Sequence, residues 1–351
     1  DTIDLSDNDS FMEYFFEDND DILDRKRTLL KRMLLGLTSY YPIDRSSIVN
    51  MPEVILPKNN PEVYSDYLIS SSINIELCPM SSKQFDKYYD ALLKDKERNM
   101  KLNKKNMYDN DNFDYHINTR RICNMVYENG KFRNMGKKDT NYISEKNKEY
   151  GDLFQSGLLK VNNGLDSYSP KINRMLTNIF KYNGEYSKGK ILFYSEFRAD
   201  SGAEIFELIL QANGYTKFDP KDSETKKYRY TFITGSEDVE ERKQNLGAYN
   251  DRKNRFGEYV QIIIISGAGA EGISLNCVRQ VHILEPYWNY IRVDQVLGRA
   301  IRMLSHIGND RDNPLLPPDK RNVEQFLYLS VFPFGNNIES IYNSLKNNKS
   351  W

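Results

Sequence analysis

The stretch YVQIIIISGAGAEGISL, residues 259–275, joins an apolar run of strand length to a loop of small residues. The run is apolar at consecutive positions up to Ser266, which favours a strand that is buried on both faces over one with a solvent-exposed face. The glycines from Gly267 onward end it. Strands of this kind occur in parallel sheets with helices on both sides, so the stretch predicts an α/β fold.

Similar runs recur through the second half of the chain and alternate with amphipathic segments. The strand-like runs are KILFYSEF (190–197), YRYTFITG (228–235), QVHILEPY (280–287) and FLYLSVFP (326–333). The helix-like segments between and after them are residues 202–215, 237–251, 291–306 and 336–348. This alternation predicts a three-layer domain over residues 168–351, with a parallel sheet and right-handed crossovers. Ligands of such sheets bind at the carboxyl ends of the strands.

The first half of the chain has a different composition. Residues 1–93 begin with an acidic arm and continue with two amphipathic segments, 22–41 and 80–98, that predict helices. Residues 94–167 are rich in Lys and Asn and poor in aliphatic side chains. Such a composition buries little core, so we expect a long insertion or mobile linker there.

Composition excludes several classes of protein. The net charge of the 351 residues is -1, so a nucleic-acid site would have to be a local basic patch. The three cysteines are far apart, which argues against disulfides and metal sites and for a reducing, intracellular location. We expect no membrane segment and no signal peptide, because no apolar run is long enough and the first residues are acidic. The chain does not begin with Met, so we expect a fragment or a processed product.

The loop GAGAEGISL, residues 267–275, allows two interpretations. Small residues would let backbone N–H groups approach a phosphate or sugar; alternatively, the glycines serve a tight turn with positive φ. Glu271 could accept a hydrogen bond from a ribose hydroxyl or a basic side chain. Two segments that resemble phosphate-binding loops, residues 184–191 and 130–138, lack the required Ser or Thr and the required spacing, respectively.

The segment DQVLGRAIRMLSH, residues 294–306, predicts a helix with one polar and one apolar face. The polar face would carry Gln295, Arg299, Arg302 and His306. The apolar face would carry Val293, Leu297, Ala300, Ile301 and Leu304. The polar face is either solvated or directed at an anion, for which the guanidinium group of arginine is well suited. Gly298 suggests that a ligand or another backbone approaches closely.

Together, ISGAGAEGISL and QVLGRAIR, about twenty residues apart and joined by VHILEPYWN, resemble motifs V and VI of superfamily 2 helicases and translocases. KGKILFYSEFRADSGAEIFELIL resembles their motif IV segment and SPKINRML its usual lead-in, so residues 168–335 resemble a second RecA-like domain. The residues of these motifs are similar to those of the helicase-like ATPases of large DNA viruses, poxviruses and giant viruses among them. Swi2/Snf2-type remodellers are the next nearest relatives.

The resemblance implies roles for particular residues. Arg299 and Arg302 match arginine fingers that reach the γ-phosphate, and Gln295 matches a nucleotide-sensing residue. Gly269, Glu271 and Gly272 match positions near the ribose and the attacking water. The positions that would contact the nucleic-acid backbone are Ser195, Arg198, Thr234, Gly235, Ser266 and Gly267. For His306 the simpler interpretation is an interaction with the helix dipole.

As a function, the resemblance implies the C-terminal half of an ATP-dependent translocase that acts in viral transcription, on DNA or RNA. ATP and Mg²⁺ would be held mainly by a first RecA-like domain that these residues lack, so we expect the chain alone to be inactive. Partners would be nucleic acid and viral RNA polymerase or its initiation and termination factors, in the cytoplasmic viral factory or the virion. The alternatives are a non-enzymatic docking module and a Swi2/Snf2-type DNA translocase.

Overall fold

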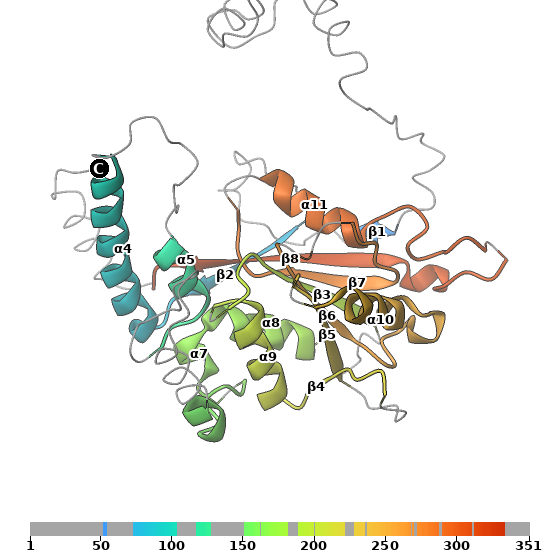
Figure 1. Cartoon of the computed structure of the whole chain (residues 1–351), viewed down its shortest axis with the longest axis horizontal. Helices are drawn as coiled ribbons and strands as arrows, with labels where there is room; N and C mark the ends of the chain where they lie inside the picture. Colours follow the sequence, from blue (N-terminus) through green and yellow to red (C-terminus); the bar gives the residue numbers. More distant parts are fainter. Residues whose placement is uncertain are drawn as a thin grey trace, which may run out of the picture. The chain divides into compact units, whose positions relative to one another are not determined.

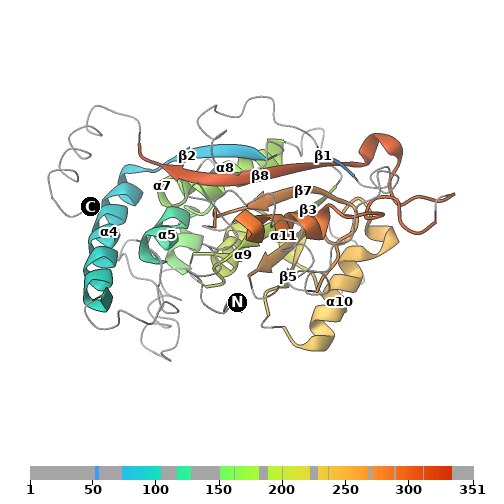
Figure 2. The same ribbon diagram turned by 90° about the horizontal axis from the view of Figure 1, so that it is seen from above.

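A β-sheet of eight parallel strands runs through the centre of the computed structural model (Figure 1). The structure describes residues 52–54, 73–103, 117–127, 151–161, 163–181, 189–199, 201–221, 228–235, 237–267, 269, 272–287, 290–310 and 312–333. Within these residues the strands are β1 (Glu53–Val54), β2 (Asn74–Pro79), β3 (Lys190–Ser195), β4 (Thr216–Lys217), β5 (Arg229–Ile233), β6 (Ile262–Ser266), β7 (Val278–Ile283) and β8 (Asn322–Val331). Their order is β1-β8-β7-β3-β6-β5-β4, with β2 also paired to β8, and all neighbours are parallel (Figure 2).

Helices cover both faces of this sheet. They are α4 (Ser82–Asn103), α5 (Ile117–Asn124), α7 (Leu165–Tyr168), α8 (Pro170–Lys181), α9 (Ala203–Ala212), α10 (Val239–Asn250) and α11 (Tyr290–Ala300). One core cluster joins α8 and α9 to the sheet face that carries Phe193. A second joins α10 and α11 to the face that carries Leu192. The predicted three-layer α/β fold is therefore confirmed.

Strand β6 contains the apolar run of residues 262–265, from which the α/β fold was predicted. It lies between β3 and β5, and all five of its residues are buried. Successive side chains of a strand point to opposite faces. Accordingly, Ile262 and Ile264 belong to one core cluster, and Ile263 and Ile265 to the other. A strand covered on both sides has no solvated face on which polar residues could alternate.

The packed unit begins before residue 168, which differs from the predicted division of the chain. Strand β2 pairs with β8 along its whole length, from Asn74 to Pro79. Tyr127 and Leu159, within the range predicted as insertion or linker, are fully buried in the first core cluster. The prediction rested on average composition, which hides short apolar segments such as residues 125–127. Packed residues therefore occur on both sides of residues 94 and 168, and the division into domains there stays a prediction.

The predicted helix at 80–98 is confirmed as α4. The predicted helices at 22–41 and 336–348 lie outside the described residues. None of the helices in the described ranges is both long and apolar enough to cross a membrane.

Candidate functional site

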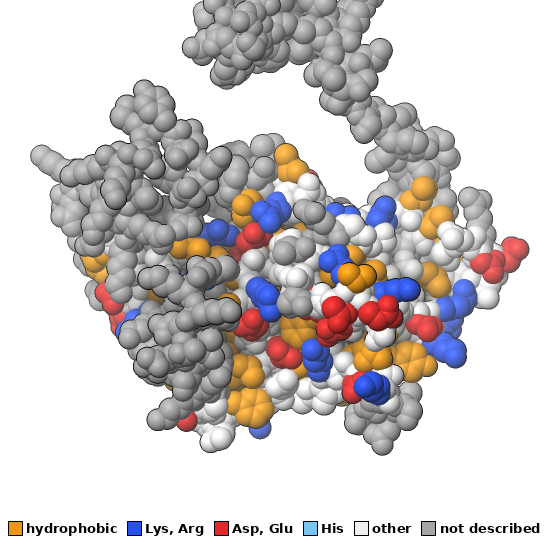
Figure 3. Space-filling view, in the orientation of Figure 1, with side chains coloured by type: hydrophobic (Ala, Val, Ile, Leu, Met, Phe, Trp, Pro, Cys, Tyr) orange, Lys and Arg blue, Asp and Glu red, His pale blue; other side chains and the backbone are white. Residues whose placement is uncertain are grey.

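The described residues that the sequence singled out lie at or after the carboxyl ends of β3, β5 and β6, on α11, which follows β7, or in the turn after α11. Because neighbouring strands are parallel, these loops meet at one edge of the sheet, where α/β proteins bind ligands. On the face drawn in Figure 3, described side chains of both charges are interspersed. The described side chains of this face form no broad positive surface that would attract an anion (Figure 3). An anion site at the sheet edge would therefore depend on individual side chains and backbone groups there.

Helix α11 packs on the sheet as its sequence predicts. Val293, Leu297 and Ala300 are buried in the second core cluster, whereas Gln295 is exposed. The helix nevertheless ends at Ala300 instead of continuing to His306. Leu304 has a positive φ of 65°, which a helix cannot accommodate. The single polar face predicted for Gln295, Arg299, Arg302 and His306 is thus wrong beyond residue 300.

Both arginines contact the segment that follows the glycine-rich loop. Arg299 Nη1 lies 3.5 Å from the carbonyl oxygen of Ile273, and Arg302 Nη1 donates to the Ser274 hydroxyl. The Leu275 N–H donates to the Arg299 carbonyl oxygen at 3.0 Å. The two motifs thus form one connected structure, although twenty residues separate them in the sequence.

Arg299 has one buried hydrogen-bond donor that the protein does not use. Its Nε is buried and has no hydrogen-bond partner in the described part of the chain. A buried donor without an acceptor costs about 1–3 kcal/mol, more when it is charged. An anionic ligand that supplied the acceptor would recover this energy.

His306 lies in the core, contrary to the prediction that it interacts with the end of a helix. Its side chain is fully buried, and Nε2 lies 2.8 Å from the Val278 carbonyl oxygen. A carbonyl oxygen only accepts, so Nε2 carries the proton of a neutral ring. Burial lowers the pKa of His306 to about 4, with smaller contributions from nearby arginines and a lysine. This residue stabilises the turn after α11 and is not exposed to a ligand.

We expect His306 to make the stability depend on pH. Its pKa is about 4 in the folded protein and 6.5 when unperturbed, so between these values the unfolded chain binds a proton that the folded chain does not. The free energy of unfolding therefore falls as the pH drops from about 6.5 to about 4. In urea titrations over this range, His306→Gln should reduce the slope by up to about 1.4 kcal/mol per pH unit.

The comparison of wild type with His306→Gln isolates this residue. His282, whose pKa burial lowers to about 3, titrates in the same sense but is present in both proteins. Glutamine keeps an N–H that can reach Val278. Identical slopes in the two proteins would contradict the assignment of a buried neutral His306.

The glycine-rich loop has the positive φ of the tight-turn interpretation, and contact with a phosphate or sugar stays a prediction. Gly272 has a positive φ of 71°, as the tight-turn interpretation requires. A Cβ on Gly269 would lie 1.7 Å from the Ile233 carbonyl oxygen, so this glycine allows two backbone segments to approach each other closely. Glu271 lies outside the described residues. A Cβ on Gly298, by contrast, would meet no atom within 4 Å, so nothing in the described chain explains that glycine.

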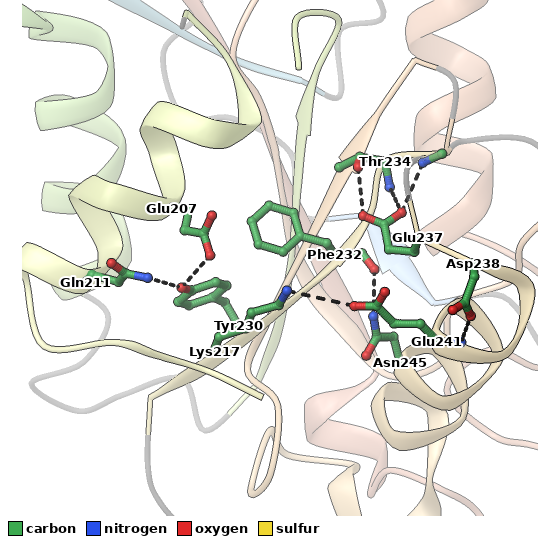
Figure 4. A network of polar contacts seen from close by, with 11 residues as sticks. Glu207, Gln211, Lys217, Tyr230, Phe232, Thr234, Glu237, Asp238, Glu241 and Asn245 are labelled. Atoms are coloured by element: carbon green, nitrogen blue, oxygen red, sulfur yellow. Dashed lines mark hydrogen bonds and ion pairs between the residues drawn. The ribbon is translucent and has the colours of Figure 1, made fainter. Parts of the chain in front are cut away.

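The turn after β5 presents its hydrogen-bond donors to a carboxylate of the same chain (Figure 4). The Thr234 N–H and hydroxyl lie 2.7 and 2.8 Å from the two Glu237 carboxylate oxygens, and the Gly235 N–H lies 3.1 Å from one of them. Three donors thus surround one anionic group. A phosphate could bind Thr234 and Gly235 only after the Glu237 carboxylate moves away.

Two serines predicted to contact nucleic acid are buried instead. Ser195 is fully buried, and its hydroxyl lies 2.6 Å from Glu285 Oε1. Ser266 is also buried and donates to the Thr234 carbonyl oxygen at 2.9 Å. A serine at the end of a central strand is surrounded by the neighbouring strand ends, which the sequence could not indicate. Both hydroxyls therefore bond within the protein in this structure, and contact of these residues with nucleic acid stays a prediction.

Arg198, Gly235 and Gly267 are the predicted nucleic-acid contacts with access to solvent. The Arg198 side chain is half exposed and lies 3.6 Å from Glu204 in an ion pair. At Gly267, an added Cβ would lie 3.0 Å from Arg292 Nη2 and 3.0 Å from Glu196 Oε2. Arg292 and Glu196 form an ion pair of 3.1 Å. Arg292 was not among the predicted residues, although it falls on the helix face of Gln295 and Arg299 at i, i+3 and i+7.

Comparison with known protein families shows which family the residues of the candidate site resemble. The family model "Helicase conserved C-terminal domain" matches residues 171–304, which include β3 to β7 and the loops of the candidate site. Residues 171–304 are thus similar to a helicase C-terminal domain. The predicted resemblance to superfamily 2 helicases is thereby confirmed at the level of this domain.

Relatives of this chain include proteins of large DNA viruses. A protein of Acanthamoeba polyphaga mimivirus that is named as an ATP-dependent RNA helicase is 27% identical over 307 residues, or 87% of this chain and 44% of that protein. The "Termination factor NPH-I homolog" of African swine fever virus is 34% identical over 199 residues, or 47% of this chain and 26% of that protein. The chain thus spans less than half the length of the relatives it matches.

Solved structures similar to this helicase domain include two ATPases. The Sulfolobus solfataricus SWI2/SNF2 ATPase core in complex with dsDNA has a TM-score of 0.38 and 17% identity, over 78% of this chain and 43% of that one. The C-terminal part of the Fun30 ATPase domain has a TM-score of 0.41 and 14% identity, over 79% of this chain and 96% of that one.

Proposed function

We propose that the chain is the C-terminal half of a viral superfamily 2 motor that uses ATP hydrolysis to move along DNA or RNA. The observation that carries this proposal is the direct contact between the two helicase motifs. The hydrogen bond from Leu275 to Arg299 holds the glycine-rich loop beside the end of α11. A nucleotide bound there would meet the loop backbone and the guanidinium groups together.

In this proposal Arg299 and Arg302 reach toward the γ-phosphate of ATP. A guanidinium group stabilises the charge that spreads over the transferring phosphoryl group. The unused Nε donor of Arg299 supports the assignment, since it lacks an acceptor in the described residues. Gln295, exposed on the same helix, would sense the nucleotide, and Gly269, Glu271 and Gly272 would lie near its ribose.

The chain holds neither a recognisable phosphate-binding loop nor an acidic strand end for Mg²⁺. We therefore assign ATP and Mg²⁺ mainly to a first RecA-like domain. Its lysine and acidic side chains would bind the phosphates and the ion, and the residues of this chain would complete the site from the other side. The name of the termination factor homologue supports a place in viral transcription, with viral RNA polymerase or its factors as partners.

The test is ATP hydrolysis by the full-length protein with and without nucleic acid. We expect DNA or RNA to raise the rate, because a translocase couples the closure of its cleft to the strand it holds. The 351-residue chain alone should hydrolyse ATP poorly. A full-length protein whose hydrolysis responds to no DNA or RNA, single-stranded or double-stranded, would exclude a motor and leave a docking module.

A further inference from the structure

Helix α5 lies at the same edge of the sheet as the candidate site, but outside residues 171–304 that match the helicase family. Its last residue, Asn124, donates through Nδ2 to the Ser201 carbonyl oxygen and to Glu285 Oε1, both at 2.8 Å. Both bonds are buried, so the helix has a fixed position beside the loops that follow β3 and β7. Figure 1 shows α5 near one end of the sheet.

Helix α5 places the guanidinium group of Arg120 over two aromatic rings at this edge. Its Cζ lies 5.1 Å from the ring centroid of Phe197 and 5.6 Å from that of Tyr287. Phe197 follows β3 and Tyr287 follows β7. Ring faces attract a cation, but they supply neither a full counter-charge nor strong acceptors for its N–H groups.

Among the described residues Arg120 has no ion-pair partner and leaves a donor unused. Its Nη2 is buried and lacks a hydrogen-bond partner within the described residues. Such an atom is costly to bury, and the cost is higher for a charged group than for a neutral one. The described part of the chain supplies no hydrogen-bond acceptor for this atom, so an acceptor from outside the chain would fit this position.

A second arginine makes the surroundings of Tyr287 more positive. Arg292 lies 4.8 Å from the centroid of the Tyr287 ring and pairs with Glu196 at 3.1 Å. It also borders Gly267, a predicted contact of the nucleic-acid backbone. Two guanidinium groups therefore lie over one ring. Among the described residues one carboxylate, that of Glu196, forms an ion pair with one of them, Arg292.

We propose that Arg120, with Tyr287 and Arg292, forms an additional contact for the phosphate backbone of a nucleic-acid strand. Phosphate matches guanidinium in charge and in hydrogen-bond geometry. A nucleic-acid strand bound at Gly267 would lie beside this cluster, because Arg292 borders Gly267. The Tyr287 ring, which both arginines approach, suits a flexible strand whose sugars and bases stack on it. The inference rests on the proposed function and extends the track onto an element outside the matched family domain.

The experiment measures the affinity of the full-length protein for a DNA or RNA oligonucleotide as a function of salt concentration. Loss of one phosphate contact lowers the slope of log K against log salt by about 0.7 for a single strand and about 0.9 for a duplex. We expect Arg120→Gln to show this reduction and to bind about tenfold more weakly at low salt. Arg120→Lys keeps the charge and should recover most of the slope. A structural role alone would change the melting temperature but not the salt slope.

Arg255→Gln is the matched control. Its guanidinium group also covers an aromatic ring, that of Phe256 at 5.2 Å, but it precedes β6 and therefore lies at the opposite edge of the sheet. We expect its affinity and salt slope to equal those of the wild type. If Arg120→Gln does not fold, the unaltered protein is modified with phenylglyoxal, and a bound oligonucleotide should slow the reaction at Arg120 but not at Arg255.

The outcomes separate the two proposals. A wild type that binds no nucleic acid would overturn the proposed function and this inference together. A wild type that binds, with Arg120→Gln showing the same salt slope, would overturn this inference alone. Equal phenylglyoxal reactivity of Arg120 with and without oligonucleotide would do the same.

Discussion

Replacement of Arg299 by alanine is expected to lower the ATP turnover of the full-length protein by about 10³-fold or more. The arginine contributes to the charge on the transferring phosphoryl group and little to the ground-state complex, so nucleotide affinity should stay within a few-fold of the wild type. Steady-state turnover and the binding of a fluorescent ATP analogue measure the two quantities separately. The loss should therefore appear in kcat and hardly in KM.

A structural effect of Arg299→Ala is distinguished by two measurements. The side chain has a long contact to Ile273 and an unused Nε, so its removal should change the melting temperature little. Arg252→Ala is the control: this arginine bonds to the 313–314 backbone and to none of the proposed site residues among the described contacts, so its loss should leave turnover unchanged. Retained turnover in a folded Arg299→Ala protein would refute its assignment as an arginine finger.

Gly269→Ala is expected to destabilise the protein by about 3 kcal/mol, the upper range for an overpacked interior position. The added Cβ would lie 1.7 Å from the Ile233 carbonyl oxygen and 2.5 Å from its carbon, so one of the two backbones must shift. Both segments belong to the candidate site. The variant should therefore lose stability in chemical denaturation and lose turnover even where it is folded.

Gly298→Ala is the matched control, because it adds the same methyl group beside the same proposed cleft. A Cβ at Gly298 meets no atom within 4 Å, so the stability should stay equal or rise by up to about 1 kcal/mol through the helix propensity of alanine. A Gly269→Ala protein as stable as the wild type would mean that the loop does not approach β5 as described.

Much of the fold could be predicted from local patterns. The run from Ile262 to Ile265 is apolar on both faces because β6 is covered on both faces, and this single feature implies a parallel sheet. The apolar positions of α11, such as Val293 and Leu297, likewise follow from the spacing of one helix face. These predictions succeed because the burial of a central element constrains every residue in it.

Other elements could not be predicted because their stability comes from distant partners. Strand β2 is held by β8, about 250 residues later in the chain, and four of its six residues are only partly buried. Helix α5 is short, and its position depends on bonds from Asn124 to residues 201 and 285. The helix predicted for residues 294–306 was too long, because no residue near Ala300 marks in the sequence where the chain leaves the helix and enters the core.

The sequence by itself determined the α/β fold and the pairing of two helicase motifs, since both depend on residue types at fixed short spacings. Only the tertiary structure decided which predicted groups can face a ligand. The fold buries the hydroxyls of Ser195 and Ser266 with internal partners, whereas Arg120 and Arg299 each keep a donor without a partner among the described residues. Burial and hydrogen-bond partners depend on segments far apart in the chain, and no spacing along the sequence records them.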